Sequence, residues 1–341
     1  MNQEIKKFMH DMKMQWYDVQ IVVGGAWRFF CKQQRGMAGK MKDEHYQNSG
    51  NTDDISVVFT CNGWIWHGGL ADRLKGIVTV YDWCRRNGRS FKINFSVPFN
   101  LQDYLIPDKT DWLPKGIVYN EKYSTPKVCL MEPRTCNKKE IADHQNELFE
   151  SWMDANLSDT TMQLHIYTNM VRHNVDFGTR FHELFKPCKR LQQEIDYHVS
   201  QIGGKYISIS FRFTTLLGDF EDCTGKPLPM EEREVLIEKC LKAVAEIRKN
   251  APAYDKVLVT ADSPTFTERV KHLPDVYVIP GKVGHIDYQH NDDVNMKTFL
   301  DFFMISKAEK VYLARTGKMY NSAFAKTASM VNDRPFEVFE F

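Results

Sequence analysis

The sequence contains no long apolar run. No segment reaches the roughly 18 consecutive apolar residues that a membrane-spanning helix needs, and the first residues, MNQEIKK, lack the apolar core of a secretory signal. Basic and acidic side chains are almost equal in number, 45 against 44, so the net charge of +1 creates no field that would attract nucleic acid or anionic lipid. We therefore expect a soluble protein with no transmembrane segment and no nucleic-acid partner, in which any anion is bound by particular residues.

The common metal-binding and redox patterns are also missing. None of the eight cysteines forms a CxxC motif or stands beside a pair of histidines, which excludes a zinc ribbon and a thioredoxin motif. This use of cysteine is typical of a reducing compartment, and we expect a cytoplasmic protein.

What the sequence does contain is enough apolar surface to build folded domains. Hydrophobic residues make up 43% of the chain and charged residues 26%, which is typical of a globular protein. Because 341 residues are too many for one ordinary core, we expect two domains. The pattern of residues 55–97 predicts a strand, a glycine turn, a helix and a second strand.

The rest of the chain divides into three parts. Residues 98–135 contain five prolines and are expected to form extended connections, and residues 136–200 are expected to be helical and to cross between the domains. After residue 203, short apolar strands alternate with helices, a pattern that predicts a parallel sheet covered by helices. We therefore predict an α/β fold with one domain over residues 1–200 and a second over residues 201–341.

Four segments that follow predicted strands could bind a ligand, because ligands of open α/β sheets bind beyond the carboxyl ends of the strands. The first is the turn His67-Gly68-Gly69, with Asp72 and Arg73 at the start of the helix behind it. Two glycines would let the backbone approach a ligand closely. The turn matches neither GxGxxG nor a Walker sequence, and a tight turn followed by first-turn helix charges explains it equally well.

Arg212 lies at the end of the buried strand predicted over residues 205–213. An unpaired charge at the end of a buried strand would be costly, so this guanidinium needs a partner. A phosphate is one candidate, because arginine can bind it through two parallel hydrogen bonds. The alternative is an internal salt bridge with one of the acids just beyond, which are Asp219, Glu221 and Asp222.

The last two segments precede predicted helices. In residues 260–264, Ser263 is the expected N-cap and Pro264 the first helical residue, whereas capping does not explain Asp262. Residues 315–324 gather hydroxyl-bearing and small side chains before the last helix. They suit either a phosphate cradle or an ordinary capped helix start.

In their order along the chain, these segments resemble the GDP-fucose-dependent fucosyltransferase superfamily, which includes the α1,2-, α1,6- and protein-O-fucosyltransferases and the bacterial nodulation enzyme. The resemblance rests on HGGLADR at 67–73, SFRFTT at 210–215, TADSP at 260–264 and the segment 299–329. It covers about residues 55–97 and 203–332. It implies a GT-B-like fold, with two Rossmann-like domains that face a cleft and a second domain that binds the donor nucleotide.

The resemblance also implies roles for individual residues. Arg212 matches the first arginine of the family's His-x-Arg-Arg-x-Asp motif, which binds the β-phosphate of GDP and supports the leaving group. Ser210, Phe213 and Thr215 stand where that motif has its histidine, second arginine and aspartate, so part of the family's donor contact is missing or comes from elsewhere.

Two further segments would contact the donor by the same resemblance. Asp262, followed by Ser263, falls where related enzymes have an acid on the guanine or the ribose. The turn that touches the donor phosphates corresponds to Asn321, Ser322, Ala323 and Phe324.

The activity that the resemblance implies is an inverting transfer of fucose from GDP-fucose to a glycan hydroxyl. We expect no metal and no cofactor other than the donor, and no Asp-x-Asp pair lies near the donor segments. The α1,6 enzymes carry a glutamate eight residues after the motif arginine, and here Asp219 and Glu221 lie seven and nine residues after Arg212. Either could be the general base, or both could merely cap a loop; His67 and Asp72 are alternative bases or acceptor-positioning groups.

Two other functions fit the same residues. A non-catalytic carbohydrate- or nucleotide-binding protein on this fold is favoured if the altered motif no longer handles a diphosphate. A transferase for another nucleotide sugar would also be compatible with a single motif arginine.

Overall fold

The computed structural model describes residues 36–46, 50–65, 67–130, 139–221, 226–286 and 291–341. They form two compact units, which are each made of several stretches of chain. Of the described residues, the first unit holds those up to 67 together with those within 75–95 and 112–175, and the second holds those within 68–74, 96–111 and 176–341. The main division therefore lies near residue 175 and not at residue 200, where the sequence placed it.

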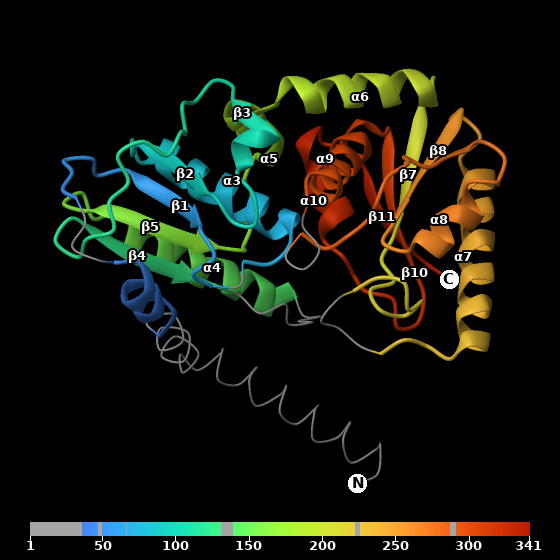
Figure 1. Cartoon of the computed structure of the whole chain (residues 1–341), viewed down its shortest axis with the longest axis horizontal. Helices are drawn as coiled ribbons and strands as arrows, with labels where there is room; N and C mark the ends of the chain where they lie inside the picture. Colours follow the sequence, from blue (N-terminus) through green and yellow to red (C-terminus); the bar gives the residue numbers. More distant parts are fainter. Residues whose placement is uncertain (1–35, 47–49, 66, 131–138, 222–225, 287–290) are drawn as a thin grey trace, which may run out of the picture. The chain divides into compact units, whose positions relative to one another are not determined.

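The first unit is built on a sheet of four parallel strands in the order β2-β1-β5-β4 (Figure 1). Residues 36–45 are helical. The other elements, in chain order, are β1 (Val57–Cys61), α3 (Leu70–Arg86, whose first turn belongs to the second unit), β2 (Phe91–Phe95), β4 (Ser124–Cys129), α4 (Lys139–Leu157) and β5 (Gln163–Thr168). The strands and the helix predicted within residues 55–97 are thereby confirmed.

Helix α3 lies very close to this sheet at Gly76. A Cβ atom at that position would come within 1.9 Å of the Thr168 carbonyl oxygen and 2.8 Å of the Phe59 ring. The close approach therefore requires glycine. Farther along α3, the Trp83 indole donates a 2.7 Å hydrogen bond to Asp154 of α4, which joins the two helices.

The opposite face of the same sheet carries several polar side chains that are buried or half-buried. It carries Asn94 and His165; His165 Nε2 lies 2.9 Å from Gln163 Oε1 of the same strand, and both residues have further partners outside the sheet. The Tyr46 hydroxyl lies 2.6 Å from His165 Nδ1, and the Asn94 amide donates to the Tyr119 hydroxyl. Burial lowers the pKa of His165 to about 3, so the imidazole is neutral and its hydrogen bonds on this face involve no charge on the ring.

The expectation that residues 136–200 are entirely helical is wrong. They contain β5, which lies between β1 and β4 in the first sheet, and the short strand β6 (Phe185–Pro187). Polar Gln163 and His165 interrupt the apolar character of β5, and this hides it from a search for apolar runs.

The second unit contains a sheet of five parallel strands in the order β11-β10-β7-β8-β9 and a small antiparallel pair of β3 with β6. In chain order its remaining elements are η1 (Leu101–Asp103), β3 (Leu105–Pro107), α5 (Phe177–Leu184), α6 (Lys189–Ile202), β7 (Tyr206–Phe211), α7 (Met230–Asn250), β8 (Lys256–Ala261), α8 (Pro264–Val270), β9 (Val276–Tyr277), α9 (Asp292–Lys307), β10 (Lys310–Arg315), α10 (Phe324–Val331) and β11 (Phe336–Glu340).

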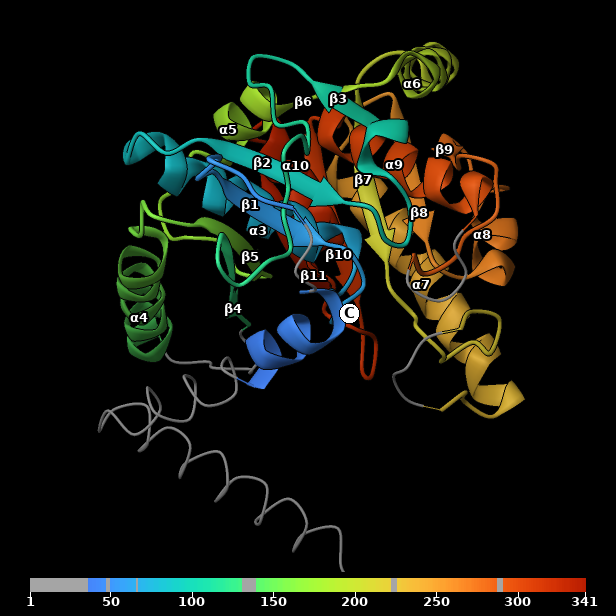
Figure 2. The same cartoon turned by 60° about the vertical axis from the view of Figure 1, so that its left-hand side comes forward.

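Helices cover both faces of the five-stranded sheet. α7 and α8 pack on one face against alternate apolar residues of β7 and β8, and α9 and α10 lie on the other face (Figures 1 and 2). The Tyr206 hydroxyl reaches the Met304 carbonyl oxygen of α9 at 2.7 Å, as expected for a side chain opposite the α7 face. The alternation predicted after residue 203 is confirmed, although β11 was not predicted.

Both units are thus parallel α/β structures of the Rossmann type, which confirms the predicted GT-B-like class. In the part of the chain that the structure describes, no helix is both long enough and apolar enough to cross a membrane.

Candidate functional site

The strand order of the second unit identifies where a ligand would bind. From β7 the chain moves to β8 and β9 on one side, and it then returns through α9 to β10 on the other side of β7. The carboxyl ends of β7 and β10 therefore flank a topological switch point, the place where open α/β sheets bind ligands. Arg212 follows β7, and the Tyr320 N–H donates a 3.0 Å hydrogen bond to the Arg212 carbonyl oxygen, so the loops after β7 and β10 meet here.

The Arg212 side chain is paired with Asp262. Arg212 Nη1 lies 3.1 Å from Asp262 Oδ2, and the guanidinium carbon lies 4.8 Å from the centroid of the Phe220 ring. Of the two side chains, 21% of Arg212 but only 6% of Asp262 is exposed. An acid after β8, Asp262, is therefore an internal partner of Arg212; Asp222, one of the partners considered from the sequence, lies outside the described residues.

Asp262 also holds the backbone of the Arg212 loop. Its Oδ1 accepts the Phe213 N–H at 2.8 Å, and its Oδ2 accepts the Thr214 N–H at 2.7 Å. Burial raises the pKa of the Asp262 carboxyl above its usual range, while the charge of Arg212 and the two N–H groups act against that rise.

Asp219 caps helix α8. Its Oδ2 accepts the Ser263 hydroxyl at 2.6 Å and the Thr265 N–H at 2.9 Å. Ser263 Oγ in turn accepts the Phe266 N–H at 3.1 Å, and Pro264 is the first helical residue, which confirms the predicted cap. A carboxylate of the chain thus occupies the place at the start of α8 where an external anion could have bound. Glu221 is exposed.

The four predicted residues before the last helix lie at the start of α10. Phe324 is its first residue, and the Phe324 N–H donates to Ser322 Oγ at 3.2 Å. Ser322 and Ala323 are half-buried, and Asn321 is exposed. The loop that these residues close begins at the carboxyl end of β10, and so it borders the switch point.

The glycine turn is held by its own arginine. Gly68 has φ of +69°, a left-handed conformation that favours glycine, and Asp72 Oδ2 would lie 2.9 Å from a Cβ there. Arg73 is 1% exposed and donates to the carbonyl oxygens of Gly68 at 2.9 Å and Val97 at 2.6 Å. His285, which no sequence pattern singled out, also lies near this turn: its Nε2 would lie 3.9 Å from a Cβ at Gly69.

His67 belongs to the first unit, where it is nearly buried. Its Nε2 accepts the Gly63 N–H at 3.2 Å, and its carbonyl oxygen accepts the Tyr167 hydroxyl. The two rings meet edge to face, 4.4 Å between centroids. His67 follows β1 along the chain, and Tyr167 lies within the neighbouring strand β5.

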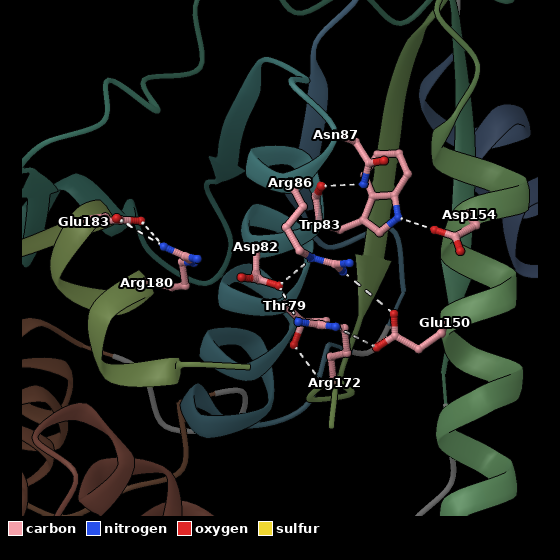
Figure 3. A network of polar contacts seen from close by, with 10 residues as sticks. All are labelled: Thr79, Asp82, Trp83, Arg86, Asn87, Glu150, Asp154, Arg172, Arg180 and Glu183. Atoms are coloured by element: carbon pink, nitrogen blue, oxygen red, sulfur yellow. Dashed lines mark hydrogen bonds and ion pairs between the residues drawn. The ribbon is translucent and has the colours of Figure 1, made fainter. Parts of the chain in front are cut away.

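A second charged cluster, which the sequence did not reveal, joins the helices of the first unit (Figure 3). Buried Asp82 of α3 accepts hydrogen bonds from Arg86 at 3.1 Å and Arg172 at 2.8 Å, and both arginines also pair with Glu150 of α4. The Arg172 N–H donates to Thr79 Oγ1. These contacts are internal and balanced in charge, so we assign the cluster to stability.

The residues that depart from the family motif have structural positions. Phe213 is fully buried, and its ring packs against Phe211 and Phe266, with centroids 6.1 and 5.1 Å away. The hydroxyls of Ser210 and Thr260 share a 2.8 Å hydrogen bond. Within the described ranges, no group of three His, Cys, Asp or Glu side chains is arranged to hold a metal ion.

No protein-family model and no curated protein sequence matches this chain. Solved structures do resemble it. Fucosyltransferase NodZ from Bradyrhizobium superposes over 82% of this chain and 92% of NodZ, with a TM-score of 0.51 and 16% sequence identity. NodZ α1,6-fucosyltransferase soaked with GDP-fucose gives a TM-score of 0.50 at 16% identity, over 81% of this chain and 92% of that chain.

The apo form of POFUT1 aligns over 85% of this chain and 99% of its own, with a TM-score of 0.47 and 10% identity. The resemblance noted in the sequence is thus confirmed at the level of the fold by the NodZ structures.

Proposed function

We propose that this chain is a glycosyltransferase that moves fucose from GDP-fucose to a hydroxyl group of a glycan acceptor, with inversion and without a metal ion. Arg212 carries the proposal. Its guanidinium lies at the switch point of a Rossmann-type sheet, where it is paired with the buried carboxylate of Asp262. The fold shared with NodZ, a structure of which was soaked with GDP-fucose, supports the choice of donor.

The chemistry requires that the charge of the departing nucleoside diphosphate be dispersed. Arg212 would bind the β-phosphate, and the first N–H groups of α10 would face the same diphosphate from the loop after β10. The hydrogen bond from Tyr320 to the Arg212 carbonyl oxygen ties these two loops together, which supports a shared role.

Glu221 is the better candidate for the general base. One carboxylate oxygen of Asp219 already accepts two hydrogen bonds at the start of α8, so moving this side chain would uncap the helix. Glu221 is exposed and has a carboxylate that an acceptor hydroxyl could approach. We therefore assign Glu221 as the base and Asp219 as a supporting residue.

One observation favours a second candidate function, a non-catalytic nucleotide- or carbohydrate-binding protein. The place of the second motif arginine is taken by Phe213, which is part of the core and makes no charge available. If one arginine does not stabilise the leaving group sufficiently, the protein would bind a nucleotide sugar and leave it intact.

The decisive experiment measures GDP release from GDP-fucose, with a mixture of glycans as acceptors and with EDTA present. We expect release that depends on the acceptor, that EDTA leaves unchanged and that Glu221→Gln abolishes. Binding of GDP-fucose without release would favour the binding protein, and release from another nucleotide sugar alone would change the donor. Activity that EDTA abolishes and Mn²⁺ restores would contradict the metal-independent mechanism.

A further inference from the structure

Three partners of the Asp262 carboxylate lie in the loop after β7. They are the Arg212 guanidinium, the Phe213 N–H and the Thr214 N–H, at 3.1, 2.8 and 2.7 Å. The parallel register explains this geometry. Phe211, the last residue of β7, is paired with Ala261, the last residue of β8, so the residues that follow them, Arg212 and Asp262, lie side by side. Both carboxylate oxygens are therefore engaged inside the protein.

The loop that Asp262 holds is under conformational strain. Thr214 has φ of +54°, in the left-handed region that β-branched residues rarely adopt. A conformation of this kind persists only where the surroundings impose it, and here two hydrogen bonds to one buried carboxylate do so. Asp262 therefore fixes the backbone from which Arg212 projects as well as the guanidinium itself.

The sequence suggests why the carboxylate comes from the neighbouring strand. The acid of the family motif would stand at position 215 in the same loop, but this chain has threonine there. Asp262 supplies a negative charge from the end of β8 to the same loop. With 6% of its side chain exposed, it offers little surface to a ribose or a guanine base.

We infer that Asp262 is a positioning residue, which holds Arg212 and the 213–214 backbone in the geometry that stabilises the leaving diphosphate, and that it does not contact the nucleotide. This inference rests on the proposed function. It replaces the nucleotide contact that the family resemblance implied for Asp262.

Kinetics of four proteins test the inference: the wild type, Asp262→Asn, Arg212→Ala and the double variant. The asparagine can accept only one of the two N–H groups and carries no charge for Arg212. If Asp262 acts through Arg212, Asp262→Asn should lower kcat about tenfold or more, keep KM for GDP-fucose within about threefold, and add nothing to the loss caused by Arg212→Ala.

Asp275→Asn is the matched control, because Asp275 is a partly exposed carboxylate of the same unit that pairs with Lys256. It should keep wild-type kinetics. A rise in KM as the main effect of Asp262→Asn would mean that the carboxylate touches the nucleotide, and independent losses in the double variant would mean that the two side chains are uncoupled. Either result overturns the inference.

Two further arms keep the test decisive. If the asparagine variant does not fold, Asp262→Glu takes its place. Glutamate keeps the charge but displaces it by one methylene group, so the same loss of kcat is expected. A wild-type protein that turns over no nucleotide sugar would refute the proposed function alone. In that case the free energy of unfolding is measured for the same four proteins. If the losses of the two single variants simply add in the double variant, Arg212 and Asp262 are not coupled and the positioning role is refuted.

Discussion

Arg212 illustrates what a single residue reveals before a structure is known. A guanidinium after a buried strand had to have a partner, and that requirement was predicted correctly from the cost of burying a charge. The identity of the partner was not, because the candidates considered were Asp219, Glu221 and Asp222, which are near in sequence. Asp262 is 50 residues away along the chain and becomes adjacent only through the pairing of β7 with β8.

Substitution of Arg212 should separate catalysis from folding. Arg212→Lys keeps a positive charge near Asp262 but loses the planar fork, so turnover should fall by about 10²-fold or more while the melting temperature stays near that of the wild type. Arg212→Ala should be inactive and also less stable. The loss of stability should be below the roughly 3–5 kcal/mol of a fully buried pair, because part of Arg212 is exposed.

Thermal unfolding and GDP-release assays on the two variants provide the measurement. If both variants are stable, bind GDP and turn over at the wild-type rate, Arg212 lies outside the site and the transferase proposal loses its main support.

His165 should make the stability of the protein depend on pH. Its pKa is near 3 in the folded protein because of burial, compared with about 6.5 in an unfolded chain. Between these values only the unfolded chain binds the proton, so stability is complete above pH 6.5 and falls as the pH decreases. One proton corresponds to about 1.4 kcal/mol per pH unit.

Urea unfolding between pH 7.5 and pH 4.5 measures this slope. His165→Gln should make the dependence shallower by about one proton. His272→Gln, at an exposed position, serves as the control and should follow the wild type. An identical slope in all three proteins would show that His165 is not the titrating group.

Helices and strands were predicted correctly where their buried side chains recur in the sequence at the period of a helix or a strand. Helix α3 has one apolar stripe and ends before Asn87-Gly88, and its bounds were close to those predicted. Strand β5 gave no such signal, because its polar side chains on one face are satisfied by hydrogen bonds from residues far away in the chain. A binary apolar pattern does not describe a sheet whose buried face is polar.

Gly76 sets how closely α3 approaches the first sheet. Gly76→Ala would place a methyl group 1.9 Å from the Thr168 carbonyl oxygen, so helix and sheet would have to separate. We expect a loss of about 1–3 kcal/mol in the free energy of unfolding, measured in urea.

The matched control is Gly39→Ala, in the helix of residues 36–45, where nothing lies within 4 Å of the added Cβ. It should be neutral or stabilise by up to about 1 kcal/mol, because alanine favours helix over glycine. A Gly76→Ala variant as stable as the Gly39→Ala variant would contradict the close contact.

At the scale of the whole molecule, the fold class was predictable and the position of the site was predictable only in part. Alternating strands and helices indicated parallel sheets, and the loops after β7, β8 and β10 were all identified as candidates. Strand order could not be read from the pattern, although it distinguishes the loops after β7 and β10 as the pair at the switch point. The division near residue 175 could not be predicted either, because the sequence pattern of α5 and α6 indicates helices but does not show which unit they pack against.

Nucleotide binding should stabilise the protein as a whole. If the proposed site binds GDP, a concentration of about 100 times the dissociation constant should add roughly 2.7 kcal/mol to the free energy of unfolding, with EDTA present. A melting-temperature series with GDP, UDP and inorganic phosphate measures the effect. Equal shifts for all three would indicate a phosphate site without nucleotide preference, and no shift with GDP would contradict the donor assignment.

The discontinuous make-up of the second unit affects the order of events during synthesis. Residues 68–74 and 96–111 leave the ribosome long before the residues after 175, with which they pack. Leu70, Leu74, Leu101 and Tyr104 are buried in the finished protein but have no complete unit to join until the last strands are made. At about 5–20 residues per second that interval is roughly 12–54 s, during which these apolar side chains are a natural binding place for a nascent-chain chaperone.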